Sequence, residues 1–372
     1  MIYFDNASTS RFKPTSVIRA VKKELCHSAN PGRGSHDESL RAASTVESCR
    51  EEIKRRFFDG NVVFTKNCTE ALNLAIKGLC LKGNVVTTIY EHNSVLRTLK
   101  ALSLDKHIEL RIVSPEKGDI ASPLLRSVTS DTSLVVITAM SNVTGETPDV
   151  SAITKAIKNK TDCLVMVDMA QAAGHIDVNL SDVDLCAFSG HKSLHGPQGT
   201  GFLLSKYEIP IRALILGGTG SSSLSLMQPD SIPDGLESGT MNTPGIAGLQ
   251  KGILYTMTHF ESLYQKRDKV FRSLKLGLSE IRGANIIAAN NGIILVNFPG
   301  MDCGDGADRL NQYGICVRAG LHCAPLAHRY LRTLPYGAIR FSVGVDNTLS
   351  DAEITLNAIE NILHNRSDFH IY

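Results

Sequence analysis

Between about residues 60 and 205 the chain alternates short apolar runs with helical patterns, and this alternation constrains the fold more than any other feature. It is typical of parallel strands joined by right-handed crossovers, so we predict an α/β fold with a doubly wound, mostly parallel, seven-stranded sheet. Apolar runs without polar interruptions fit strands buried on both faces. The predicted strands are Val62–Thr65, Asn84–Thr88, Ile108–Val113, Leu134–Ala139, Cys163–Val167, Leu185–Phe188 and Gly201–Leu204. The predicted helices are Glu70–Leu81, Ser94–Ser103, Pro123–Ser130 and Val150–Asn159.

A second domain is expected, because 372 residues exceed what one small core accommodates. The C-terminal part has a long helical pattern, two strands and a closing helix, which predict a smaller α+β domain. These elements are Ala247–Arg282, Gly292–Phe298, Ala338–Val343 and Ser350–Asn365. We expect the first residues of the chain to join this domain. The predicted boundaries are 13–255 for the large domain, and 1–12 with 256–372 for the small one.

The composition favours a globular enzyme and excludes several other classes. Hydrophobic residues make up 42% and charged residues 20%, and a net charge of +2 gives no reason to expect a nucleic-acid or membrane partner. The N-terminus lacks a basic region followed by an apolar stretch, so no signal peptide is expected. The nine cysteines form no Cys-x-x-Cys pair, which argues against a zinc ribbon, another metal site or a disulfide framework. We therefore expect reduced thiols and a cytoplasmic location.

Polar residues follow five of the predicted strands. In open α/β sheets ligands bind at the carboxyl ends of the strands, so we expect these groups to converge on one crevice. They are Thr65–Thr69, Glu91–His92, Ser141–Asn142, Asp168 and Ser189–Lys192.

Lys192 and Asp168, 24 residues apart, fit pyridoxal 5′-phosphate (PLP) chemistry. Lys192 follows Ser189-Gly190-His191 and would form the Schiff base with the cofactor's aldehyde, while Asp168 would hold the pyridine nitrogen protonated. A surface lysine and a simple helix N-cap are the alternatives. Gln171, one turn after Asp168, would reach the cofactor's ring oxygen.

The turn before the first predicted helix could bind the cofactor's phosphate. Backbone N–H groups at Cys68 and Thr69, with the Thr69 hydroxyl, form a cradle at the helix N-terminus, and a plain N-cap is the alternative. Ser189 and His191 would add phosphate contacts. His92 would stack on a flat ring and move protons, although a lone histidine is more often structural.

Cys323 is the candidate nucleophile. It lies in a loop of small residues with Arg318, His322 and His328 nearby, and such neighbours favour an accessible thiolate. A buried small hydrophobe is the ordinary alternative for a lone cysteine. Arg340 would suit a bidentate clamp on a substrate carboxylate, and a surface charge is its alternative.

With these motifs the chain resembles the class V aminotransferases, a family of fold-type I PLP enzymes. Within that family it is similar to the second group of cysteine desulfurases, which also contains selenocysteine lyases. The segments that carry the resemblance span nearly the whole chain. They are Tyr3–Thr9, Asn30–His36, Phe64–Ala71, Glu91–Asn93, Ser141–Gly145, Val167–Gln171, Ser189–Lys192, Glu237–Pro244, Arg318–Cys323 and Arg340–Ser342.

The resemblance implies further roles. Ala7 would line the substrate pocket, Asn142 would lie near the cofactor's ring oxygen and contact substrate, and Arg318 and Arg340 would bind substrate. Thr243 would reach the phosphate of a partner subunit, which implies a homodimer with shared active sites. The chain departs from the family's pattern at three positions. Cys68 stands where a small hydroxyl or glycine is usual, Leu321 replaces a frequent histidine, and Asp346 replaces an aromatic residue.

The implied activity is conversion of L-cysteine to L-alanine, with transfer of the sulfur to Cys323 as a persulfide. The sulfur would pass to an acceptor protein, with iron–sulfur cluster assembly as one destination. The alternatives are a selenocysteine lyase, another class V reaction such as transamination, and a PLP-bound scaffold with little turnover. A nicotinamide-dependent dehydrogenase is disfavoured, because no Gly-x-Gly-x-x-Gly follows the first strand.

Overall fold

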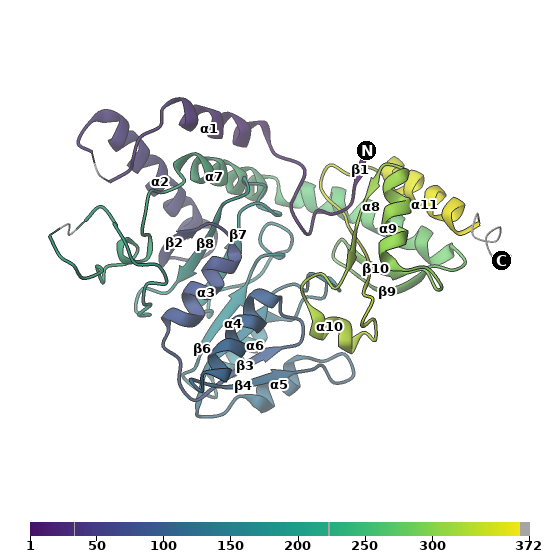
Figure 1. Cartoon of the computed structure of the whole chain (residues 1–372), viewed down its shortest axis with the longest axis horizontal. Helices are drawn as coiled ribbons and strands as arrows, with labels where there is room; N and C mark the ends of the chain where they lie inside the picture. Colours follow the sequence, from purple (N-terminus) through teal and green to yellow (C-terminus); the bar gives the residue numbers. More distant parts are fainter. Residues whose placement is uncertain (33, 222–223, 365–372) are drawn as a thin grey trace. The chain divides into compact units, whose positions relative to one another are not determined.

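The computed structural model describes residues 1–32, 34–221 and 224–364, and it divides into two compact units (Figure 1). The larger unit comprises Lys13–Met140 and Pro148–Thr258. The smaller unit comprises Met1–Phe12, Ser141–Thr147 and His259–Tyr372. Two predicted positions lie outside the described residues: Arg33, in the small-residue loop, and Asn365, at the end of the predicted closing helix.

A seven-stranded sheet forms the centre of the larger unit, with strand order β2-β8-β7-β6-β5-β3-β4. The strands are β2 (Asn61–Thr65), β3 (Asn84–Thr88), β4 (Glu109–Val113), β5 (Thr132–Thr138), β6 (Leu164–Asp168), β7 (Leu185–Ser189) and β8 (Gly201–Ser205). All neighbouring pairs are parallel except the two that involve β8. The prediction of a mostly parallel seven-stranded sheet is confirmed.

The direction of β8 follows from its connection. Residues 190–200 join β7 to β8 without a helix, and a parallel neighbour would need a helical crossover of a dozen or more residues. β8 therefore runs antiparallel to both β7 and β2. The segment 190–200, which forms no crossover helix, contains the candidate lysine, Lys192.

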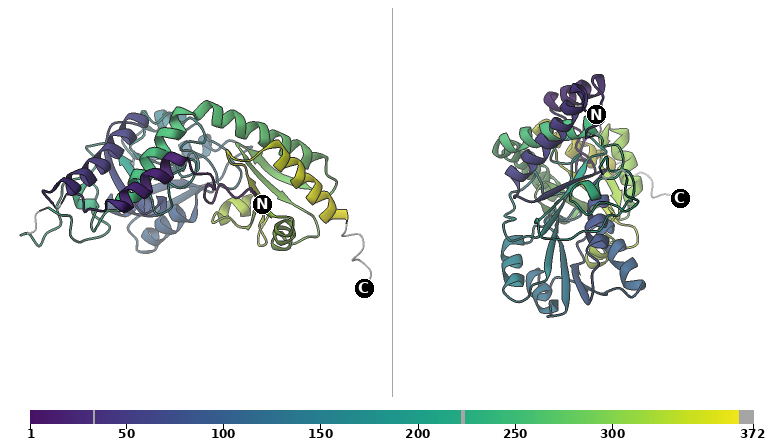
Figure 2. Two further views of the ribbon diagram at one scale, coloured as in Figure 1. Left: turned by 90° about the horizontal axis from the view of Figure 1, so that it is seen from above. Right: turned by 90° about the vertical axis from the view of Figure 1, so that its left-hand side faces the viewer.

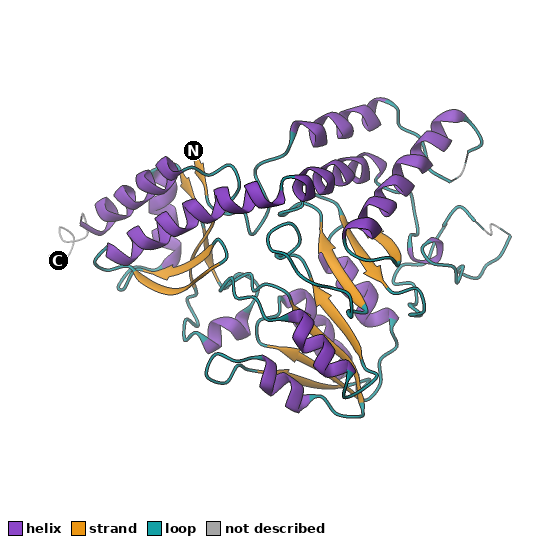
Figure 3. Cartoon of the chain, turned by 180° about the vertical axis from the view of Figure 1, so that it is seen from behind, coloured by secondary structure: helices purple, strands orange, loops and turns teal. Residues whose placement is uncertain are grey.

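Helices cover both faces of this sheet (Figures 2 and 3). Right-handed crossovers put α3 with α4 on one face and α5 with α6 on the other, and each pair is in contact. A further layer consists of α1, α2 and α7, in which α7 contacts the other two. These helices are α1 (Thr15–Cys26), α2 (Asp37–Arg56), α3 (Cys68–Gly78), α4 (Asn93–Leu104), α5 (Ala121–Ser127), α6 (Val150–Lys158) and α7 (Thr243–Thr258), with a short 3-10 helix η1 (Asp234–Leu236).

The smaller unit is built on a four-stranded antiparallel sheet of order β12-β13-β10-β9. Its core includes Phe4, Leu274, Ile294 and Phe341, all completely buried. The strands are β9 (Asn285–Asn290), β10 (Ile293–Asn297), β12 (Arg318–Gly320) and β13 (Ala338–Ser342), and a separate parallel pair joins β1 (Ile2–Tyr3) to β11 (Ile315–Cys316). The helices are α8 (Phe260–Glu280), α9 (Cys303–Gln312), α10 (Pro325–Tyr330) and α11 (Leu349–His364).

The structure differs from the predicted organisation in three ways. The single helical pattern Ala247–Arg282 is two helices, α7 and α8, and the division between the units falls after Thr258. The segment Ser141–Thr147 belongs to the smaller unit, where the Asn290 and Asn291 amides donate to its carbonyl groups. Several elements were not predicted, namely the helices α1, α2, α9 and α10 and the short strands β1, β9, β11 and β12. Across the described ranges, no helix is both long enough and apolar enough to cross a membrane.

Candidate active site

Asp168 ends β6 with its side chain buried in the larger unit. Its Oδ1 accepts hydrogen bonds from the backbone N–H of Ala170 (2.9 Å) and from the thiol of Cys68 (Sγ to Oδ1, 3.4 Å). The turn that begins α3 therefore lies against the end of β6. Burial, followed by the charge of Asp168, raises the pKa of Cys68 well above its usual range, so this cysteine stays a thiol.

Lys192 lies in the loop that joins β7 to β8. Backbone hydrogen bonds close this loop, from Gly190 N to Thr200 O (2.9 Å) and from Gly196 N to Gly190 O (2.8 Å). A Cβ atom at position 190 would come within 2.2 Å of Thr200 Oγ1, so the sequence Ser-Gly-His-Lys requires its glycine there. The loop is thus folded back on itself at the end of a buried strand.

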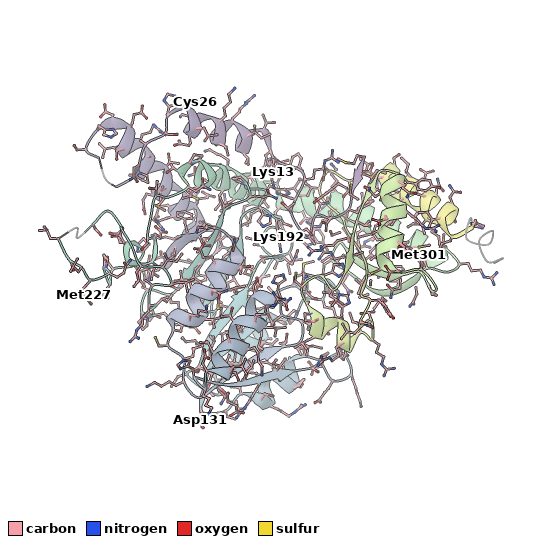
Figure 4. All side chains as sticks on the ribbon, viewed as in Figure 1. Lys13, Cys26, Asp131, Lys192, Met227 and Met301 are labelled. Carbon is pink, nitrogen blue, oxygen red and sulfur yellow. The ribbon has the colours of Figure 1, made fainter. Side chains whose placement is uncertain are left out.

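A second lysine lies beside this loop. Lys13 Nζ donates to the carbonyl oxygen of His191 (3.2 Å). Figure 4 labels Lys13 and Lys192. Burial lowers the pKa of Lys13 to about 8. Burial and the charges of the two lysines lower the pKa of His191 to about 4, so its imidazole is neutral at pH 7.

The N-terminus of α3 forms the predicted cradle. Asn67 caps the helix, since its Oδ1 accepts from Glu70 N (2.9 Å), and the N–H groups of Cys68 and Thr69 belong to the first turn, which lacks intrahelical partners. Thr69 Oγ1 lies 2.7 Å from Ser94 Oγ. Gly201 allows this close packing, because a Cβ there would lie 2.6 Å from the Asn67 carbonyl carbon.

His92 is the N-cap of α4. Its Nδ1 accepts from Ser94 N (3.1 Å) and lies 2.8 Å from Ser94 Oγ. Because Nδ1 acts as an acceptor, a neutral His92 carries its proton on Nε2. The histidine predicted to stack on the cofactor therefore has a fixed backbone anchor and a defined tautomer.

Glu91 is a buried carboxyl group whose importance was not predicted from the sequence. Its Oε1 accepts from Thr88 Oγ1 (2.8 Å) and from Thr138 N (3.0 Å), and within the described residues Oε2 has no hydrogen-bond partner. Burial first, and then the charge of Asp168, raise the pKa of Glu91 to about 8. The position of Glu91 just before His92, at the end of a fully buried strand, was the available signal.

Cys323 occupies a strained turn in the smaller unit. Both His322 (φ 48°) and Cys323 (φ 56°) adopt the left-handed conformation, which is uncommon for residues other than glycine. Arg318, on β12, places Nη2 3.9 Å from Cys323 Sγ. The thiol is half-buried and lies next to a fixed positive charge.

Arg340 lies on β13 and is only 1% exposed. Its Nη1 donates to Asn142 O (2.8 Å), and its Nη2 donates to Asp5 Oδ1 (3.0 Å) and Ser8 Oγ (3.1 Å). Burial lowers its pKa to about 10, so the guanidinium remains charged at neutral pH. Its buried Nε has no partner within the described residues, which leaves one N–H for a bound anion. The sequence did not reveal that Asp5 and Ser8 hold this arginine.

The structure places Asn142 with the cysteine turn. Its Nδ2 donates to the carbonyl oxygen of His322 (2.7 Å), and its own carbonyl oxygen accepts from Arg340. The five polar strand ends therefore do not all belong to one unit: four lie in the larger unit, and Ser141–Asn142 lies in the smaller one. Ala7 is also in the smaller unit, where its N–H donates to Ser342 Oγ (2.9 Å).

The residues of the larger unit fit PLP. The Oγ atom of Ser189 is buried and forms no hydrogen bond within the described residues, so its hydroxyl group is available for a phosphate. A buried carboxylate, a lysine loop, a histidine of defined tautomer and the buried Gln171 accompany it. No cluster of three or more potential metal ligands occurs in the part of the chain that the structure describes.

Comparison with known proteins gives one consistent result. The family model "Aminotransferase class-V" matches residues 2–354. The "Probable cysteine desulfurase" of Methanothermobacter thermautotrophicus is 32% identical, over 97% of this chain and 94% of that protein. The "Cysteine desulfurase CsdA" of Escherichia coli is 30% identical, over 97% of this chain and 94% of that protein. The solved structure of a cysteine desulfurase from Thermococcus onnurineus NA1 matches with a TM-score of 0.90 and 30% identity, covering 98% of this chain and 95% of that one.

Proposed function

This chain belongs to the class V aminotransferase family, and we propose that it is a PLP-dependent cysteine desulfurase that transfers the sulfur of L-cysteine to Cys323. The overall change is cysteine plus the Cys323 thiol giving alanine plus the Cys323 persulfide. The observation that carries the proposal is the position of Cys323, on a strained turn with its sulfur beside the Arg318 guanidinium. A plain transaminase has no use for a thiol in this position.

The larger unit would hold the cofactor. Asp168 would face the pyridine nitrogen, His92 would stack on the ring, and Gln171 would approach the ring oxygen. The first turn of α3, with Thr69, Ser189 and His191, would bind the phosphate. When bound, PLP supplies an electron sink that allows the Cα–H bond of an attached amino acid to break.

Lys192 would anchor the cofactor and then serve as the base that removes the substrate's α-proton. Lys13 lies beside the loop that carries Lys192, where its Nζ donates to the carbonyl oxygen of His191. His92 would move protons from its Nε2–H. Each of these roles uses a group that lies at a strand end of the larger unit.

The smaller unit would provide substrate binding and the nucleophile. Arg340 would bind the substrate carboxylate, with Asn142, Ala7 and Arg318 forming the rest of the binding surface. The Cys323 thiolate would attack the substrate sulfur, so that an S–S bond forms as the Cβ–S bond breaks. A proton returns to carbon, and alanine leaves.

The decisive experiment measures alanine and sulfide release from L-cysteine in the presence of a reductant, for the wild type and Cys323→Ala. We expect Cys323→Ala to lose at least about 100-fold in cysteine turnover, because no other thiolate replaces the nucleophile. The visible absorbance band of bound PLP should be unchanged. Cys316→Ala, which removes another thiol of the same unit, should retain wild-type turnover.

Full alanine production by Cys323→Ala would contradict the proposed mechanism. Selenocysteine turnover that survives in this variant would then favour a selenocysteine lyase. Pyruvate formation with an amino acceptor would instead favour a transaminase.

The proposed assembly is a homodimer in which Thr243 reaches the phosphate in the partner subunit. Exposed apolar side chains in the connection between β8 and α7, namely Leu224, Leu226 and Met227, support a second subunit, because an interface would cover them. Light scattering should give twice the chain mass of 40.3 kDa, and a monomer would contradict the assembly.

We further propose that the persulfide passes to an acceptor protein and that iron–sulfur cluster assembly is its destination. All nine cysteines are free thiols, which supports a reducing compartment such as the cytoplasm. Radiolabelled cysteine should transfer its sulfur to an acceptor protein through Cys323, and Cys323→Ala should transfer none.

A further inference from the structure

A chain of hydrogen bonds runs behind the Cys323 turn. The carbonyl oxygen of Arg318 lies 3.1 Å from His322 Nε2, and His322 Nδ1 lies 3.1 Å from His328 Nε2. His328 Nδ1 in turn lies 2.7 Å from Thr333 Oγ1. Both histidines are almost completely buried, and their rings are stacked with centroids 5.3 Å apart.

The direction of this chain is fixed by its first member. A carbonyl oxygen only accepts, so His322 Nε2 carries a proton and donates it. His322 Nδ1 then accepts from the Nε2–H of His328. The Thr333 hydroxyl donates to His328 Nδ1 at 2.7 Å, and the carbonyl oxygen of His328, at 3.1 Å, is its second and longer acceptor. This assignment requires neutral imidazoles. Burial, followed by the charge of Arg340, lowers the pKa of His322 to about 2 and that of His328 to about 4.

The same chain stabilises the turn that carries the thiol. His322 and Cys323 both have positive φ, a strained conformation that persists only where surrounding groups enforce it. The His322 ring is held by His328, its carbonyl oxygen by Asn142, and the turn is closed by Ala324 N donating to Leu321 O (2.9 Å). The hydrogen bond at Arg318 O anchors the residue whose guanidinium contacts Cys323 Sγ.

We propose that His328 and Thr333 are positioning residues that hold His322 in one tautomer and thereby keep Cys323 on the Arg318 guanidinium. This inference rests on the proposed function of Cys323 as sulfur acceptor. Neither residue contacts the thiol, so both act through His322. The charged groups around the turn are Arg318, Arg340 and the carboxylate of Asp5, which pairs with Arg340.

Thr333→Val and Thr333→Ser form a matched pair, since valine removes the hydroxyl group and serine keeps it. In the holoenzyme, iodoacetamide alkylation of Cys323 is followed by mass spectrometry at pH 7 and pH 10. The alkylation rate at pH 7 divided by the rate at pH 10 reports the fraction of Cys323 that is thiolate at pH 7. Changes in the accessibility of the sulfur affect both rates and cancel in this ratio. We expect Thr333→Val to lower this ratio and kcat for cysteine roughly fivefold, with KM within about twofold, because one buried hydrogen bond is lost.

Thr333→Ser should retain the wild-type ratio and kcat. The inference is overturned if valine leaves the ratio unchanged, or if serine and valine lower it equally. If Thr333→Val does not fold, His328→Gln, which keeps a donor toward His322, should retain more of the ratio than His328→Leu, and equal values would overturn the inference. If Cys323 is not the sulfur acceptor, Thr333→Val will still lower the alkylation ratio but will not lower kcat, so the two failures are distinguishable.

Discussion

Burial determines the protonation state of the Glu91 side chain. Its Oε1 has two donors, its Oε2 has no partner within the described residues, and its pKa is raised to about 8. The carboxyl group is therefore mostly protonated at pH 7. A neutral acid there avoids placing a second negative charge near Asp168, the residue proposed to face the cofactor's ring nitrogen.

The raised pKa of Glu91 predicts a pH-dependent loss of stability. Its contribution is fully present below the unfolded pKa near 4.5 and decreases as the pH rises to about 8, because the unfolded chain releases the proton first. Glu91→Gln keeps the acceptor for Thr88 and cannot ionise. Urea unfolding should show the variant gaining stability over the wild type between pH 5 and pH 8, by on the order of 1 kcal/mol per pH unit. A difference that does not vary with pH would contradict this.

The antiparallel pair of β12 and β13 is the element on which the cysteine turn depends. Arg318 lies opposite Arg340 in this pair, so it carries both guanidinium groups of the smaller unit's site. The preceding turn places Gly337 at φ 84°, with its Cα against the backbone of Gly320. A side chain at position 337 would push the two strands apart.

Gly337→Ala should therefore destabilise this strand pair. The added Cβ would lie 2.3 Å from Gly320 O, whereas at Gly314, also with positive φ, the nearest atom is 3.9 Å away. We expect Gly314→Ala to lower the free energy of unfolding by about 1 kcal/mol, and Gly337→Ala to lower it by at least about 2 kcal/mol more, with loss of cysteine turnover. Thermal unfolding of both variants tests this, and equal losses would exclude the steric explanation.

At the scale of the whole molecule, buried neutral histidines occur in both units. His191 in the larger unit, and His322 and His328 in the smaller unit, all have pKa values lowered by burial. Because the unfolded chain binds protons that the native chain does not, stability falls as the pH drops through the unfolded pKa near 6.5. The buried Glu91 has the opposite effect on stability in this range. Because three histidines act against one carboxyl group, we expect the histidines to determine the net change.

Wild-type protein should accordingly lose stability between pH 6.5 and pH 5. His328→Gln should weaken that dependence, since one of the three histidines no longer titrates. The measurement is the urea midpoint of each protein across this range. A variant with the same slope as the wild type would show that His328 is not neutral in the native state.

The fold was predicted best where apolar periodicity is strong. All seven strands of the large sheet appear within two residues of their predicted ends. Most of them are buried runs, whereas β4, at the edge of the sheet, is mostly exposed or half-buried. The helix α2 was not predicted, although Ser39, Ala42, Val46, Cys49 and Ile53 form a buried stripe along it. Small and polar residues make that stripe weak in a hydrophobicity pattern. The long pattern from Ala247 did not reveal its break at His259, since periodicity continues across it.

The sequence by itself determined which chemistry the chain offers: a lysine and an aspartate at strand ends, a helix N-terminus beside them, and a cysteine in a loop with arginine and histidine. These features are local, because strand ends, glycine turns and caps depend on neighbours in the chain. Only the tertiary structure decided the environment of each group. The Cys68 thiol on Asp168 and the Asp5 carboxylate on Arg340 bring together distant residues. Glu91 Oε2, which has no hydrogen-bond partner among the described residues, and the hydrogen-bonded chain to Thr333 depend on burial. Desolvation and long-range contacts set protonation states, and neither can be deduced from the spacing of residues along the sequence.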